Sequence, residues 1–253
     1  NLIDQGKVHS INDKTDKQYF LSFFLFITSL YPLLEKKTCR LDLEKIPHFG
    51  ESQCLSFSHQ TLLLFSNLYK IQPVLITGAK AWHFATKKNN RWKDSLVQQI
   101  KNHNYSVKAF ISFGEIDCRK EDSILSYSIK KDKNISEVCK KTIKDYINYM
   151  EKTLSPIYSE RYYFGVPAPA RLIQLSDPYD IKRNEIIKIF NSLLKYEVLS
   201  RGSYFLDVYE MTSTVDGENN QIHMCDPTHL SPKCLPLLFD NHLYKPDSFH
   251  TMK

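Results

Sequence analysis

Three residues that are far apart in the chain have side chains that could together perform acyl transfer. A serine hydroxyl such as that of Ser52 is a weak nucleophile at neutral pH and needs a base within hydrogen-bond reach. His229 could be that base, because Asp226 lies three residues before it and can accept a hydrogen bond from its imidazole, fixing the tautomer. The sequence therefore predicts a catalytic triad of Ser52, His229 and Asp226.

The position of Ser52 supports this interpretation. The serine follows an apolar run at residues 45–49 and precedes a segment with helical spacing, so we expect it to open a helix. Backbone N–H groups point outward at a helix N-terminus, where they can stabilise an oxyanion.

Four short segments occur in a fixed order, and three of them follow strand-like apolar runs. They are Phe49-Gly50-Glu51-Ser52, Thr77-Gly78, Gly114-Glu115-Ile116-Asp117 and Asp226-Pro227-Thr228-His229. In order and context they resemble the SGNH/GDSL hydrolase superfamily, whose nucleophile follows the first strand in a Gly-Asp-Ser-like turn and whose Asp-x-x-His lies near the C-terminus. The resemblance covers residues 44–243.

The resemblance implies an oxyanion hole with three donors, of which this sequence retains two. The family uses the backbone N–H of the serine, here Ser52, and that of a glycine after the second strand, here Gly78. Its third donor is the asparagine of a Gly-x-Asn-Asp segment, and Ile116 occupies that position. Losing one such donor typically costs about 2.7–4 kcal/mol of transition-state stabilisation. Glu51 in place of the usual aspartate is a milder departure.

Seven residues near these segments are candidates for substrate contacts or for the missing donor. They are Glu51, Lys80, Trp82, His83, Glu115, Asp117 and Arg119. Arg119, Lys80 and the Trp82 indole N–H could replace the asparagine. Asp117 and Arg119 form either a structural ion pair or a ligand contact. His83 and Trp82 either line a sugar-binding cleft or pack inside the protein.

Three other histidines, His59, His83 and His223, compete for the role of base. His59 falls about two turns along the helix that Ser52 is expected to open, which directs it away from the hydroxyl. His223 precedes the Asp-x-x-His segment by only a few residues.

The elements that must position these residues alternate along the chain. Apolar runs predict strands at residues 45–49, 73–77, 107–113, 162–166 and 204–208. Helical spacing is found at residues 55–69, 92–102, 135–154 and 180–199, whereas 124–133 and 212–222 are expected to be surface loops.

This alternation predicts an α/β domain over residues 45–253, preceded by an N-terminal helical extension over residues 1–44. The expected architecture has three α/β/α layers around a mainly parallel sheet of roughly five strands, a flavodoxin-like SGNH fold. Ligands bind such sheets outside the carboxyl ends of the strands, where Ser52, Gly78 and Gly114 are placed.

Composition excludes several classes of protein. With 7 glycines in 253 residues, the chain has no phosphate-cradling loop, so we expect no nucleotide cofactor. The net charge of +6 comes from scattered Lys and Arg, which argues against nucleic-acid binding and would suit an anionic glycan. No Cys-x-x-Cys pair occurs among the six cysteines, so we expect no metal site and no cofactor.

Cysteine positions and the first apolar stretch bear on the cellular location. Cys54, Cys118 and Cys225 lie within two residues of the motif segments and are interpreted as reduced packing residues, unless Cys39 or Cys139 pairs with one of them. Together with the lack of a signal peptide, this favours the cytoplasm.

The most apolar stretch, at residues 19–34, is short for a membrane span. We expect a helix buried against the domain and no membrane association. Because the chain begins with Asn1 rather than Met, it is compatible with a longer parent chain that carries an upstream domain.

These features lead to three hypotheses of function. The first is a serine esterase or deacetylase that acts on an acylated small molecule or glycan through an acyl-enzyme. The second is an acyl- or glycosyltransferase on the same scaffold, in which the Asp-His pair activates an acceptor hydroxyl. The third is a catalytically weak binding domain, which the loss of the oxyanion asparagine at Ile116 would explain.

Overall fold

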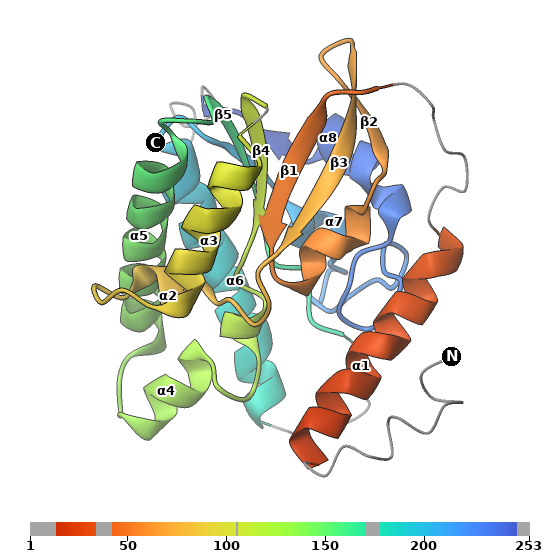
Figure 1. The fold of residues 1–253 in the computed structure, drawn as a ribbon. Coiled ribbons are helices and arrows are strands. Elements are labelled where there is room, and N and C mark those ends of the chain that lie inside the picture. The colour runs from red at the N-terminus through yellow and green to blue at the C-terminus, as the bar shows by residue number, and fades with distance from the viewer. Residues whose placement is uncertain (1–13, 34–41, 105, 171–177, 247–253) are drawn as a thin grey trace.

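The structure, a computed structural model, describes residues 14–33, 42–104, 106–170 and 178–246 as an α/β fold built on one seven-stranded sheet (Figure 1). The central strands are parallel, and the two edge strands, β2 and β7, are antiparallel to their neighbours. In sheet order the strands are β2 (Thr61–Leu64), β3 (Asn67–Leu75), β1 (Lys45–Gly50), β4 (Lys108–Ser112), β5 (Glu160–Phe164), β6 (Tyr204–Leu206) and β7 (Leu243–Tyr244).

The five predicted strands are the five parallel ones, so the prediction of a mainly parallel α/β sheet is confirmed. The predicted count of roughly five strands was too low, because each edge adds an antiparallel strand. One of them, β7, has only two residues and leaves little periodicity in the sequence.

The predicted helix at residues 55–69 is wrong. A short 3-10 helix, η3 (Ser52–Phe57), is followed by the hairpin of β2 and β3. The hairpin turns at Phe65 and Ser66, whose φ angles of 48° and 68° are those of a two-residue turn that glycine or asparagine usually occupies. Leu62 and Leu64 are buried while Leu63 is exposed, so the burial alternates as in a strand.

Two hydrophobic cores form on the two faces of the sheet, because successive strand residues point to opposite sides. On one face Phe49 and Ile111 pack against helices α2 (Ala81–Ala85), α3 (Arg91–Asn102), α5 (Ile135–Leu154) and α6 (Pro178–Leu199). On the other face Ile46 and Phe110 pack against η3, α7 (Val208–Thr212) and α8 (Leu235–Asn241). Figure 1 shows α3 and α5 on the opposite side of the sheet from α8.

Three of the observed helices were predicted closely, namely α3, α5 and α6. The expected loop at residues 124–133 is wrong in its first part, which forms α4 (Ile124–Lys130) behind a capping box of Ser123 and Ser126. The expected loop at residues 212–222 begins at the end of α7 and turns at Gly217, whose φ is 81°.

The N-terminal extension contains α1 (Lys14–Leu30) and a 3-10 turn, η2 (Tyr31–Leu33). Among the α1 side chains whose burial the structure describes, Phe26 and Leu30 are buried. Phe23, Leu25, Ile27 and Tyr31 are exposed, so the expected burial against the domain is found at Phe26 and Leu30 and not at these four residues. None of the helices within the described residues is both long and apolar enough to cross a membrane.

Candidate active site

The nucleophile turn lies at the carboxyl end of β1, between the neighbouring strands β3 and β4. Gly50 pairs with Ser112 of β4, and a Cβ atom on Gly50 would lie 2.3 Å from the Ser112 Oγ atom. Only glycine fits there. The chain then turns at the buried Glu51 into η3, which Ser52 opens. The helix that Ser52 begins is thus a six-residue 3-10 helix rather than the expected long one.

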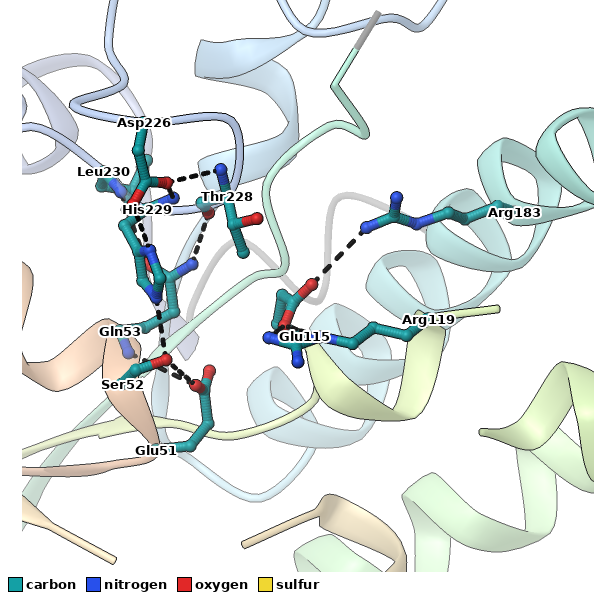
Figure 2. A network of polar contacts seen from close by, with 10 residues as sticks. All are labelled: Glu51, Ser52, Gln53, Glu115, Arg119, Arg183, Asp226, Thr228, His229 and Leu230. Carbon is teal, nitrogen blue, oxygen red and sulfur yellow. Dashed lines mark hydrogen bonds and ion pairs between the residues drawn. The ribbon is translucent and has the colours of Figure 1, made fainter. Parts of the chain in front are cut away.

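The structure brings Ser52, His229 and Asp226 together in one hydrogen-bonded chain, as Figure 2 shows. The Nε2 atom of His229 lies 2.8 Å from the Ser52 Oγ atom, and its Nδ1 atom lies 2.8 Å from the Asp226 Oδ2 atom. The loop that carries His229 and the turn that carries Ser52 are separated by 177 residues. This is the spatial arrangement of nucleophile, base and orienting carboxylate.

Asp226 is held as a carboxylate. Burial by itself would raise its pKa, but the hydrogen bond and positive charge of His229, together with the backbone N–H groups of Thr228 and His229, lower the pKa below its ordinary value. Both N–H groups donate to Oδ1 at 2.7 Å, which leaves Oδ2 for the imidazole. The Nδ1–H therefore donates to Asp226, and Nε2 is free to accept a proton from Ser52.

Gln53 fixes the two loops relative to each other. Its Nε2 atom donates to the carbonyl of Thr228 at 2.7 Å, and its Oε1 atom accepts from the N–H of Leu230 at 3.5 Å. This role of Gln53 was not predicted from the sequence. The only available signal was that Gln53 directly follows the proposed nucleophile.

The candidate oxyanion donors lie at the same edge of the sheet. Gly78 follows β3 in the left-handed conformation, with a φ of 65°, and within the described residues its N–H and that of Ser52 donate no hydrogen bond. Ile116 begins the 3-10 turn η4 (Ile116–Cys118), and Glu115 is its N-cap. The resemblance puts the third donor at Ile116, whose apolar side chain has no N–H group to donate.

Glu51 lies between the triad and a second polar cluster, formed by Glu115, Arg119 and Arg183. Its Oε2 atom lies 2.7 Å from the Ser52 Oγ atom. On the far side, Figure 2 shows Arg119 and Arg183 converging on Glu115, with contacts of 2.6 Å and 3.5 Å. Arg119 therefore pairs with Glu115, and the alternative of an ion pair with Asp117 is wrong. Arg183, from α6, was not singled out from the sequence.

Asp117 holds the first turn of α2. It is buried, and its two carboxylate oxygens accept from the N–H groups of Ala81 and Trp82 at 2.7 Å and 3.0 Å. Burial raises the pKa of Asp117 to about 6, although these two hydrogen bonds lower it. The role of Asp117 in the described structure is to position α2.

Lys80, Trp82 and His83 line a cavity of about 680 Å³ between α2 and α4. His83 also packs, since its ring stacks on Trp92 with centroids 3.4 Å apart and its Nδ1 atom accepts the N–H of Lys80. Burial, followed by the charges of Lys80 and Arg91, lowers its pKa to about 4. The two alternatives for His83, packing and lining a cleft, are therefore both observed.

The competing histidines make no contact with Ser52 among the described residues. His59 is exposed in the turn between η3 and β2. The long helix that was expected to direct it away from the Ser52 hydroxyl is not formed. His223 accepts the N–H of Ser231 through its backbone carbonyl.

The cysteines beside the motif segments are unpaired in the structure. Cys54, Cys118, Cys139 and Cys225 are all free, as is Cys234, so the pairing through Cys139 does not occur. Cys39 lies outside the described residues.

The N-terminal helix reaches the candidate base. The ring of Phe26 in α1 stacks on the imidazole of His229, with centroids 3.6 Å apart and an interplanar angle of 18°. Phe26 is only 1% exposed. One face of His229 is therefore covered by a residue from outside the α/β domain that we had predicted.

We expect Phe26→Ala to detach α1 from the site, because truncating a buried phenylalanine typically costs about 3–5 kcal/mol. Hydrogen exchange at the α1 amides measures this, and their protection should fall. Leu25→Ala is the matched control, since Leu25 is 63% exposed on the same helix. Equal loss of protection in both variants would show that Phe26 does not anchor α1.

Comparison with known proteins gives a likeness of fold. No family model matches the chain, and no curated protein matches it. A solved structure described as "a putative platelet activating factor from Streptococcus pneumonia" is 16% identical, covers 90% of this chain and 97% of its own, and superposes with a TM-score of 0.52.

Two more distant structures are an extracellular lipase from Streptomyces rimosus and an acetyl xylan esterase from Geobacillus stearothermophilus. They are 10% and 13% identical, cover 79% of this chain each and 99% and 92% of their own, and have TM-scores of 0.47 and 0.42. The first structure shows a likeness of fold: the two chains share an α/β fold. This agrees with the fold that the four motif segments predict through their resemblance to the SGNH/GDSL hydrolase superfamily.

Proposed function

We propose that the protein is a serine hydrolase that cleaves carboxylic esters on an acylated small molecule or glycan. The observation that carries the proposal is the hydrogen-bonded chain from Ser52 through His229 to Asp226, with both heavy-atom distances at 2.8 Å. Such a chain turns a hydroxyl into a nucleophile without a cofactor.

In the proposed reaction the Oγ atom of Ser52 attacks the acyl carbon, and its proton passes to Nε2 of His229. Asp226 stabilises the imidazolium that forms. The tetrahedral intermediate collapses when the alcohol leaves with that proton, and an acyl group remains on Ser52. A water molecule then gives one proton to His229 while its oxygen, which keeps the other proton, bonds to the acyl carbon. His229 passes its proton to Oγ as the bond between Oγ and the acyl carbon breaks, which releases the acid and restores the serine.

The N–H groups of Ser52 and Gly78 are proposed to bind the oxyanion. With Ile116 in the third position, we expect slow hydrolysis, about 10²–10³ below that of a complete site.

The cavity between α2 and α4 is our candidate for the leaving alcohol. Its volume of about 680 Å³ is within the usual range of small-molecule sites, roughly 300–1,000 Å³. Lys80 in its wall is two residues beyond Gly78 in the chain, which is the reason for proposing this cavity, although Ser52, Gly78 and His229 are not among its lining residues. The half-exposed ring of Trp82 gives it an aromatic wall against which a sugar could pack.

A fluorophosphonate probe tests the proposal directly, because it forms a stable adduct only with an activated serine. We expect mass spectrometry to locate the adduct on Ser52 in the wild type and to find almost none in His229→Ala. His59→Ala is the matched control, since His59 is exposed and does not contact Ser52. Ser52 of this control variant should be labelled to the same extent as in the wild type.

Two results would contradict the proposal. Equal labelling of the wild type and His229→Ala would mean that His229 is not the base. If the folded wild-type protein is not labelled, an acyl-enzyme is excluded. Direct transfer between substrates, or ligand binding without catalysis, would then be favoured.

A further inference from the structure

The hydroxyl of Ser52 has two neighbours that could both take its one proton. The Oγ atom lies 2.7 Å from Oε2 of Glu51 and 2.8 Å from Nε2 of His229. Because the Nδ1–H of His229 is committed to Asp226, the neutral imidazole can only accept at Nε2. An ionised Glu51 can also only accept. One proton cannot serve two acceptors, and it would go to the charged one.

The conflict disappears if Glu51 carries a proton. The acid then donates to Oγ, and the hydroxyl of Ser52 donates to Nε2 of His229, so both short contacts are hydrogen bonds. We propose that Glu51, as a neutral carboxylic acid, is a positioning residue that directs the proton of Ser52 toward His229. This inference rests on the proposed function, since it assigns Glu51 a role in activating the same nucleophile.

The surroundings of Glu51 are those of a neutral acid. Its side chain is buried, and its Oε1 atom has no hydrogen-bond partner within the described residues. A charged carboxylate oxygen without a hydrogen-bond donor has a high free-energy cost in the protein interior. The cost of burying an uncharged carbonyl oxygen without a donor is much lower. The remaining contact to Oε2 is the N–H of Gln53, which is long at 3.4 Å.

The charged groups around Glu51 have opposite effects on its pKa. Glu115 faces it from the η4 side with Arg119 paired to it, and His229 faces it across Ser52. Burial, followed by the negative charge of Glu115, raises the pKa of Glu51 to about 7, while the hydrogen bond from Ser52 and the charges of His229 and Arg119 lower it.

Two further titratable groups lie close to Glu51 but stay neutral. His48 lines the same small cavity and has its pKa lowered to about 3 by burial. Burial likewise raises the pKa of the Cys54 thiol far above neutrality. Neither of them changes charge between about pH 6 and pH 9.

The sign of the pH dependence follows from these states. The acid form of Glu51 predominates below its pKa and is lost as pH rises through about 7. At about pH 8.5 only about 3% remains, so the reactivity of Ser52 should fall about 30-fold. A state in which Glu51 is ionised and His229 carries the proton instead would be unreactive, because an imidazolium cannot act as the base.

The experiment is a pH profile of the rate at which the fluorophosphonate probe labels Ser52, between about pH 6 and pH 9. In the wild type the rate should fall about 30-fold between about pH 6 and pH 8.5. Glu51→Gln places a permanent N–H donor beside Oγ, so its profile should lack the alkaline fall. Glu137→Gln, at an exposed position of α5, is the control and should retain the wild-type midpoint.

A second variant keeps the inference testable if Glu51→Gln does not fold. Glu115→Gln removes the negative charge that favours the acid form of Glu51, so the alkaline midpoint should move to lower pH. An alkaline fall that persists in folded Glu51→Gln would overturn the inference, as would an unmoved midpoint in Glu115→Gln. No labelling of the wild type at any pH would instead refute the proposed function.

Discussion

Replacing Asp226 by asparagine should lower ester hydrolysis about 10⁴-fold, the cost that the same change has in a serine protease triad. The asparagine oxygen can still accept the N–H groups of Thr228 and His229, which now bind Oδ1, so the loop keeps its shape. Its amide N–H₂ then faces Nδ1 of His229 and forces the proton to Nε2. In that tautomer the imidazole donates to Ser52 and cannot accept from it.

The measurement is the rate of p-nitrophenyl acetate hydrolysis, with circular dichroism to establish that the variant folds. Asp132→Asn is a matched control. Asp132 is exposed at the end of α4 with a φ of 48°, a conformation that asparagine tolerates well. We expect the control to keep the wild-type rate. A loss of less than tenfold in Asp226→Asn would mean that Asp226 only shapes the loop.

The parallel core of the fold could be predicted because its signals are local. The helix α5 has the predicted bounds, since twenty residues of amphipathic spacing follow the N-cap Asn134. The strands that lead into Ser52, Gly78 and Gly114 are short apolar runs between polar boundaries. Parallel strands of an α/β sheet bring their carboxyl ends to one edge, so the clustering of the motif segments followed from the strand assignments.

The failures arise where a turn or a contact leaves no local signal. The turn at Phe65 and Ser66 has two residues with positive φ but no glycine, so the hairpin was interpreted as a helix. The short helix α4 covers only seven residues, too few for a period to be distinguished from chance.

Contacts between distant segments are the least predictable part of the site. Phe26 lies more than two hundred residues before His229, and nothing in either segment indicates that the two rings stack. The pairing of Glu115 with Arg119 rather than Asp117 with Arg119 depends on the direction of η4, which places Asp117 under the first turn of α2. Such choices depend on tertiary geometry and not on spacing in the chain.

Replacing Ile116 by asparagine should raise the rate of p-nitrophenyl acetate hydrolysis by about 10²–10³, because the change restores the third oxyanion donor. Ile116 is half-buried at the start of η4, which follows β4, the strand paired with β1 and its nucleophile turn. An asparagine at this position would therefore lie at the same edge of the sheet as Ser52 and Gly78. Its side-chain N–H would be worth most in the transition state, where the oxyanion carries charge, so the gain should appear in kcat more than in KM.

Ile116→Leu separates this effect from a change of packing, because leucine has nearly the same volume and no N–H group. It should leave the rate within about threefold of the wild type. A gain in both variants would point to repacking of η4, and no gain in either would mean that another group already fills the third donor position. Arg119 is the nearest candidate in sequence, but its guanidinium is held by Glu115 at 2.6 Å. A gain in Ile116→Asn alone would show that a third N–H donor is what this site lacks, while Ser52, His229 and Asp226 are already within hydrogen-bond distance of one another.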